Sequence, residues 1–100
     1  MTGELAPALT RRVGRAADAH ARALRAAAAD ALHVQRAFGA VVGFTDRSRE
    51  IPGYPAPRWV LESVDRGWLR YGRGDRVEIT GAGRAELADY DVYKAEAYEV

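Results

Sequence analysis

The sequence has no cysteine, one methionine, one lysine and four prolines among its 100 residues. Without cysteine, the chain has no disulfide framework, no thiolate zinc site and no cysteine nucleophile. The longest run of purely apolar side chains is four alanines, far short of the roughly 20 residues that a membrane span needs. No basic segment leads into a leucine-rich run near the N-terminus, so we expect no signal peptide and a cytoplasmic protein.

The composition is that of a soluble globular protein, with 48% hydrophobic and 29% charged residues. Twenty of the hydrophobic residues are alanines, so the core depends on a few larger side chains. A chain of this length predicts one domain, residues 1–100, of modest stability or with a dimer interface that adds buried surface.

Charge is distributed unevenly along the chain. Residues 1–88 carry fourteen arginines and ten acidic residues, a net charge of +4, whereas residues 89–100 carry one lysine and four acidic residues, a net charge of −3. A basic body with an acidic tail is compatible with nucleic-acid binding, but +4 is small for that role.

Residues 8–42 are rich in alanine, leucine and arginine, the strong helix formers. Apolar residues recur there at steps of three and four, which predicts one long helix or a pair of helices. Asp30 marks a bend or a second helix start within this helical arm.

Residues 43–57, "GFTDRSREIPGYPAP", contain two glycines and three prolines, which predict a connecting loop. The loop is longer than most connections, and long ordered loops often carry function. Pro57 suits the first turn of a short helix that ends at Gly67.

The rest of residues 58–100 predicts a β-hairpin followed by a helix. Val77 and Ile79 alternate with polar residues, as in a half-buried strand, and glycines separate them from the strand that starts at Trp68. Thr80 is a suitable N-cap for a helix toward Val100. Glycines 81 and 83 suit a close approach at that turn. The predicted fold is therefore α+β and mainly helical.

The stretch "VLESVDRGWLRYGRGDRVEITGAGRAEL" resembles the second half of the winged helix-turn-helix domain of bacterial transcriptional regulators, over about residues 57–88. In that family a helix ends at a glycine, a strand leads into the wing hairpin, and a Thr-x-x-Gly-Arg-x-x-Leu step enters the final helix. The first half of the family pattern is not matched, because "TDRSREIPGYPAP" leaves little room for a helix. The resemblance implies a winged-helix-like fold more strongly than operator binding.

The resemblance makes duplex DNA the first candidate partner. A wing can lay guanidinium groups along phosphates or into a narrow minor groove. The candidate contacts lie at or beside the hairpin tip, with two more flanking it: Arg70, Arg73, Arg76, Arg58 and Arg66. Asp75 lies among these arginines and could pair with one of them.

The second candidate function is protein interaction through the alanine-rich helix. A stripe at helical spacing could form a homodimer seam, and its members are Val13, His20, Leu24, Ala31 and Phe38. An unbroken helix of this length would extend about 50 Å, more than a small domain can cover. The tyrosines at 90, 93 and 98 could dock against it.

No pattern predicts catalysis, a cofactor or a metal site. The Gly-x-Gly steps lack the rest of a phosphate-binding motif, and an isolated Arg-Gly-Asp triplet recurs by chance. His20 and His33 do not have metal-ligand spacing, and Ser48 and Ser63 have no histidine close in sequence. A small enzyme with a site in the loop at 45–57 is a third hypothesis, without an identifiable mechanism.

Overall fold

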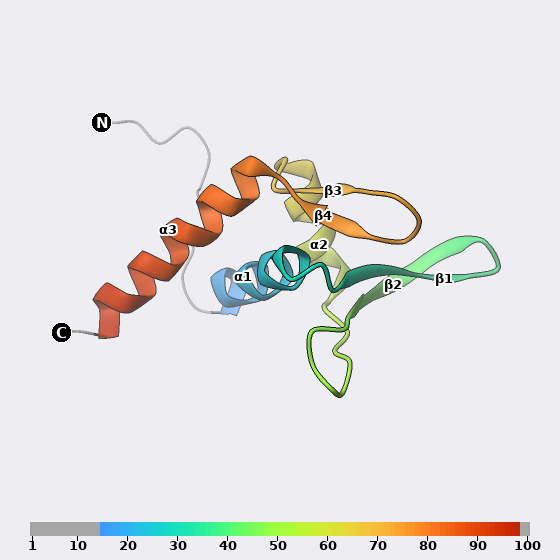
Figure 1. Cartoon of the computed structure of the whole chain (residues 1–100), viewed down its shortest axis with the longest axis horizontal. Helices are drawn as coiled ribbons and strands as arrows, with labels where there is room; N and C mark the ends of the chain where they lie inside the picture. Colours follow the sequence, from blue (N-terminus) through green and yellow to red (C-terminus); the bar gives the residue numbers. More distant parts are fainter. Residues whose placement is uncertain (1–14, 99–100) are drawn as a thin grey trace.

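The computed structural model describes residues 15–98, which form three helices and two antiparallel β-hairpins (Figure 1). The fold is therefore α+β. In chain order the elements are α1 (Arg15–Ala28), β1 (Leu32–Ala37), β2 (Ala40–Asp46), α2 (Pro57–Asp65), β3 (Leu69–Tyr71), β4 (Val77–Ile79) and α3 (Gly81–Tyr98). The two hairpins project in the same direction from the helical part, and α3 extends the opposite way (Figure 1).

Helix α1 ends much earlier than the sequence pattern predicts. The amide of Asp30 donates to the carbonyl of Ala27, and the amide of Ala31 donates to the carbonyl of Ala26. Asp30 has a φ of 61°, the left-handed conformation that closes a helix in this way and that aspartate tolerates. The predicted helix over 8–42 is confirmed for residues 15–28 and wrong beyond them, while residues 8–14 lie outside the described part.

Residues 32–46 form a hairpin instead of the second half of a helix. The strands pair from Leu32 opposite Asp46 to Ala37 opposite Ala40, with a bulge between Gln35 and Arg36. Phe38 and Gly39 form the two-residue turn, with φ of 54° and 81°, as a turn that matches the strand twist requires. The predicted loop at 43–57 therefore begins only after residue 46.

The loop at 47–56 is tied back onto the end of β2. The backbones of Asp46 and Gly53 exchange two hydrogen bonds of 2.8 and 2.9 Å, and the Asp46 carboxylate accepts from the amide of Ser48. Pro57 then opens α2, and Gly67, with a φ of 80°, follows its last turn. Both ends of this helix confirm the sequence prediction.

Every element except α3 contributes a side chain to the fully buried centre of the core. These side chains are Leu24, Leu32, Phe44, Val60, Leu69 and Val77, together with the polar His20 and Ser63. Helix α1 packs against α2, α3, β1 and β4, and its buried alanines let these neighbours approach closely. Full burial of each large apolar side chain contributes about 1.5–3 kcal/mol.

The second hairpin and the start of α3 form as predicted. Leu69 lies opposite Ile79 and Tyr71 opposite Val77. The Thr80 hydroxyl accepts from the amide of Gly83 at 3.0 Å and donates to the carbonyl of Gly67, so Thr80 is the N-cap and also ties α3 to the end of α2.

The turn into α3 requires glycine at one of its two glycine positions. A Cβ on Gly83 would overlap the Trp68 carbonyl and lie 2.8 Å from Cγ1 of Ile79, whereas a Cβ on Gly81 would meet nothing within 4 Å. The predicted close approach is therefore confirmed for Gly83 and not for Gly81.

We expect Gly83→Ala to lower the free energy of unfolding by about 2 kcal/mol or more, because backbone must move to admit the methyl group. Gly81→Ala is the matched control and should change it by less than about 0.5 kcal/mol. Urea denaturation of both variants measures the difference. Equal effects would contradict the close packing of α3 on the Trp68 carbonyl.

Candidate functional site

The two hairpins are held side by side by contacts between β1 and the end of the β3–β4 turn. His33 bridges Arg76, and the amide of Val34 donates to the carbonyl of Asp75 at 2.6 Å. The Asp75 carboxylate also binds the guanidinium of Arg36 at 2.8 Å. One edge of the first hairpin is therefore occupied by the second hairpin.

Most of the arginines predicted to contact DNA have intramolecular partners. Arg70 pairs with Glu78 at 3.1 Å, and Arg76 pairs with Asp30 at 2.6 Å. Arg66 lies 3.4 Å from Glu62 and over the ring of Trp68, and the Arg58 guanidinium lies 4.2 Å from the ring centre of Trp59.

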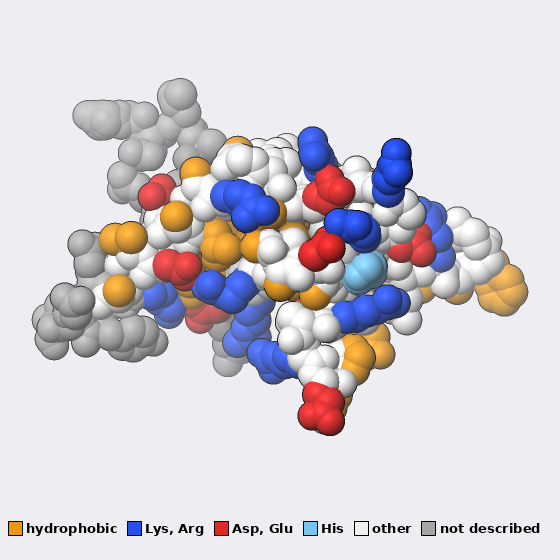
Figure 2. All heavy atoms as spheres, in the orientation of Figure 1, with side chains coloured by type: hydrophobic (Ala, Val, Ile, Leu, Met, Phe, Trp, Pro, Cys, Tyr) orange, Lys and Arg blue, Asp and Glu red, His pale blue; other side chains and the backbone are white. Residues whose placement is uncertain are grey.

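Arg73, at the tip of the second hairpin, is exposed and makes no ion pair with any residue of the described part. The predicted pairing of Asp75 with an arginine is confirmed, although its partner, Arg36, comes from the other hairpin. Acidic and basic side chains are interspersed on the face that Figure 2 shows. That face therefore carries no continuous positive band.

The five residues of the predicted dimer seam do not form one stripe. His20 and Leu24 are fully buried inside the protein, Ala31 is buried after the end of α1, and Phe38 lies at the turn between β1 and β2. Val13 lies outside the described residues. The prediction that these residues form one helical dimer surface is therefore wrong, because the helix ends at Ala28.

The outer part of the first hairpin, residues 37–42, projects from the core, and we call it the arm. From Ala37 to Val42 every side chain is apolar or absent and every residue is exposed, with Phe38 fully exposed. Hydrophobic atoms mark the end of the molecule where the hairpin tip lies (Figures 1 and 2). The sequence reasoning missed the arm, although a residue followed by glycine, with Val34 before it and Val41 and Val42 after it, is its signal.

Phe38 is an unusual residue for its place in the arm. Its left-handed conformation costs roughly 1–2 kcal/mol in a residue with a Cβ, and asparagine or glycine is the common choice in such a turn. Burial does not compensate this cost, because the ring is fully exposed. Strained residues of this kind concentrate at functional positions.

A hollow of about 780 Å³ lies between the loop at 47–56 and helices α1 and α2. Its lining includes Ala19, Arg22, Ile51, Tyr54, Pro55 and Trp59. Ile51 and Tyr54 are among the most exposed large apolar side chains of the described residues. The loop thus carries a second apolar surface, next to the residue 46 end of β2.

The fold brings His20 of α1 against Ser63 of α2, 43 positions away. The imidazole Nδ1 lies 3.1 Å from the Ser63 hydroxyl, and its Nε2 lies 3.3 Å from a carboxylate oxygen of Glu62. The hydroxyl donates to the carbonyl of Trp59 at 2.8 Å, so it accepts from the histidine. Ser63 is fully buried and its proton is committed to a backbone carbonyl, which makes this a structural network rather than a nucleophile and its base.

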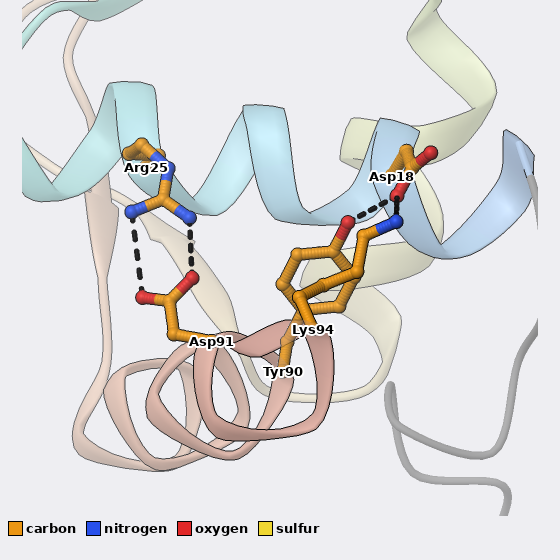
Figure 3. A network of polar contacts seen from close by, with 5 residues as sticks. All are labelled: Asp18, Arg25, Tyr90, Asp91 and Lys94. Carbon is orange, nitrogen blue, oxygen red and sulfur yellow. Dashed lines mark hydrogen bonds and ion pairs between the residues drawn. The ribbon is translucent and has the colours of Figure 1, made fainter. Parts of the chain in front are cut away.

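Helix α3 docks on α1 through a polar network (Figure 3). The Tyr90 hydroxyl donates to the Asp18 carboxylate, which Lys94 approaches at 3.2 Å. Two turns further along α1, the guanidinium of Arg25 binds both carboxylate oxygens of Asp91, at 2.6 and 3.4 Å. The predicted docking of the tyrosine-bearing segment against the first helix is confirmed at Tyr90.

The network shifts three protonation equilibria. The hydrogen bonds from Tyr90 and Lys94 lower the pKa of Asp18. Burial, and then the bond to Asp18, raise the pKa of Tyr90. The bond to Asp91 raises the pKa of Arg25. The network is therefore fully formed at neutral pH.

Within residues 15–98, no three histidine or acidic side chains converge on a point that could hold a metal ion. None of the helices in this part of the chain is long and apolar enough to cross a membrane. Comparison of the chain with protein-family models, with curated proteins and with solved structures finds no match.

We expect Asp18→Asn to lower the free energy of unfolding by about 0.5 kcal/mol at neutral pH, since the ion pair is partly exposed and screened. A lowered pKa stabilises the fold above the ordinary carboxyl range, near pH 4, and the gain is lost as pH falls through the folded-state value. The difference from wild type should therefore close in acid. Asp89→Asn, at an exposed site on α3, is the control in a urea titration at several pH values. A difference that persists unchanged at low pH would contradict this role for Asp18.

Proposed function

We propose that this chain is a protein-interaction module that acts by binding rather than by catalysis, in the cytoplasm, and that the arm is its working surface. The observation that carries the proposal is Phe38, a fully exposed aromatic ring held at a φ of 54° at the tip of the arm, whose residues carry no charge. Both the exposure and the backbone conformation are unfavourable in the isolated chain. A partner that buries the ring compensates both.

The surroundings of Phe38 support the same proposal. Val41 and Val42 extend the apolar surface along β2, and charged residues are absent from residues 37–45. Large contiguous apolar patches exposed on a folded protein usually mark interaction sites. Aromatic residues are enriched among those that dominate binding energy.

The second candidate is a winged-helix-like DNA-binding regulator or accessory factor. The order of α2, the second hairpin and the Thr80 cap of α3 supports it, as does the exposed guanidinium of Arg73. The other four candidate arginines already have partners, and residues 29–56 contain no helix to complete a helix-turn-helix pair. This candidate therefore depends on phosphate contacts near Arg73.

The first proposal is tested by placing a photo-reactive benzoylphenylalanine at position 38 of the full chain, in the cells that make it. We expect irradiation to yield a polypeptide adduct. The same group at Val92, an exposed apolar position on α3, should yield none. Absence of any adduct from position 38, or equal adducts from both positions, would refute an interaction surface on the arm.

The DNA hypothesis is tested by electrophoretic shift with duplex DNA at two salt concentrations. If it holds, binding weakens steeply with salt, and Arg73→Ala reduces both the affinity and its salt dependence. Arg84→Ala, an exposed arginine on α3, should leave binding unchanged. No shift at low salt eliminates this candidate.

A further inference from the structure

We propose that the partner of the arm is a second copy of this chain. In this dimer the β2 strands of the two copies pair antiparallel about a two-fold axis, and the Phe38 tip of each copy lies against the 47–53 loop of the other. The inference rests on the proposed function, because it takes the arm as the working surface, and it adds the identity of the partner.

The first hairpin can extend its sheet on one side. The outer edge of β1 is occupied at His33 and Val34 by the second hairpin, through the bridge to Arg76 and the bond from Val34 to Asp75. The outer edge of β2 carries neither a charged residue nor a proline from Ala40 to Thr45. Charges and prolines are the devices by which monomeric proteins protect such edges, so this edge is open to another strand.

The far end of the same edge is closed by the chain itself. Asp46 pairs with Leu32 on one side and with Gly53 on the other, so Gly53 occupies the outer edge at the last residue of β2, and the loop at 47–52 lies beyond that end. Antiparallel pairing of two β2 strands places the residue 40 end of one copy beside the residue 45 end of the other. The Phe38 tip of each copy therefore arrives at the loop of its partner.

The surface that the tip meets there is suited to an aromatic ring. Ile51 on this loop and Tyr54 directly after it are exposed, and both line the hollow of about 780 Å³ that Trp59 also lines. The dimer would cover the exposed apolar residues of the arm and of the loop in one step. Each contact would occur twice, as the two-fold symmetry of an isologous interface requires.

The charge pattern favours a second copy over an unrelated protein. An uncharged six-residue strand, about 20 Å long, pairs with itself without placing like charges opposite each other. An unrelated partner would need both an uncharged strand and an apolar pocket at its end. A second copy supplies both at the required separation.

Sedimentation equilibrium of the purified full chain over a range of concentrations tests the dimer. We expect a reversible dimer for the wild type. Val42→Lys places two lysines near the axis and should weaken association about tenfold or more. Val92→Lys is the matched control, because both valines are 57% exposed, and it should leave association unchanged.

A second variant separates association from folding. Phe38→Asn removes the ring but suits the left-handed turn, so its thermal midpoint should equal or exceed that of the wild type while association weakens about tenfold. A wild type that stays monomeric throughout overturns the inference. So does a dimer that resists both arm substitutions, or one that Val92→Lys weakens equally.

The adduct from position 38 distinguishes this inference from the proposed function. A photo-adduct of twice the mass of the chain, together with a dimer in solution, supports both. An adduct of another mass with a monomeric chain overturns the second copy and retains the interaction module. No adduct and a monomeric chain overturn both.

Discussion

The chain reversal at Asp30 is the constraint on which the rest of the structure depends. Its left-handed backbone ends α1, and its carboxylate binds Arg76 beside β4. The carbonyl of the next residue, Ala31, accepts the amide of Arg47, which follows β2. Three elements therefore converge within two residues. From this point β1 runs beside the second hairpin, which contacts it at His33 and Val34.

The distribution of charge then separates the two hairpins chemically. Carboxylates pair with two of the three arginines of the second hairpin, Asp30 with Arg76 and Glu78 with Arg70. The first hairpin uses its one arginine, Arg36, to bind Asp75 of the second. The outer part of the first hairpin is left with apolar side chains alone. The exposed apolar residues of the arm therefore support a binding role better than the arginines of the second hairpin do.

Sequence reasoning succeeds where one residue dictates the local backbone. Pro57, Gly67 and Thr80 fix the ends of α2 and the start of α3, and the alternation of Val77 and Ile79 fixes a strand. It fails over residues 31–42, where apolar steps of three and four fit a helix and a hairpin almost equally well. The sequence signal that favours the hairpin there is the Phe38–Gly39 pair, which forms its turn.

Contacts between residues far apart in the sequence could not be predicted from local sequence patterns, for a different reason. The meeting of His20 with Ser63, and of Asp18 with Tyr90, depends on how three helices pack around small alanine side chains. The candidate site had the same limitation. The exposure of residues 37–42 follows only from the end of α1 at Ala28, which the sequence pattern did not predict.

The bulge between Gln35 and Arg36 has a consequence for how this protein can evolve. Before the bulge, Val34 and Phe44 lie opposite each other and both are buried in the core, so a register slip would expose them. Beyond it, every residue from 36 to 42 is exposed, so substitutions outside the Phe38–Gly39 turn change the free energy of unfolding little. The fold and the proposed interaction surface can therefore diverge independently, since the arm can change while the body keeps its sequence.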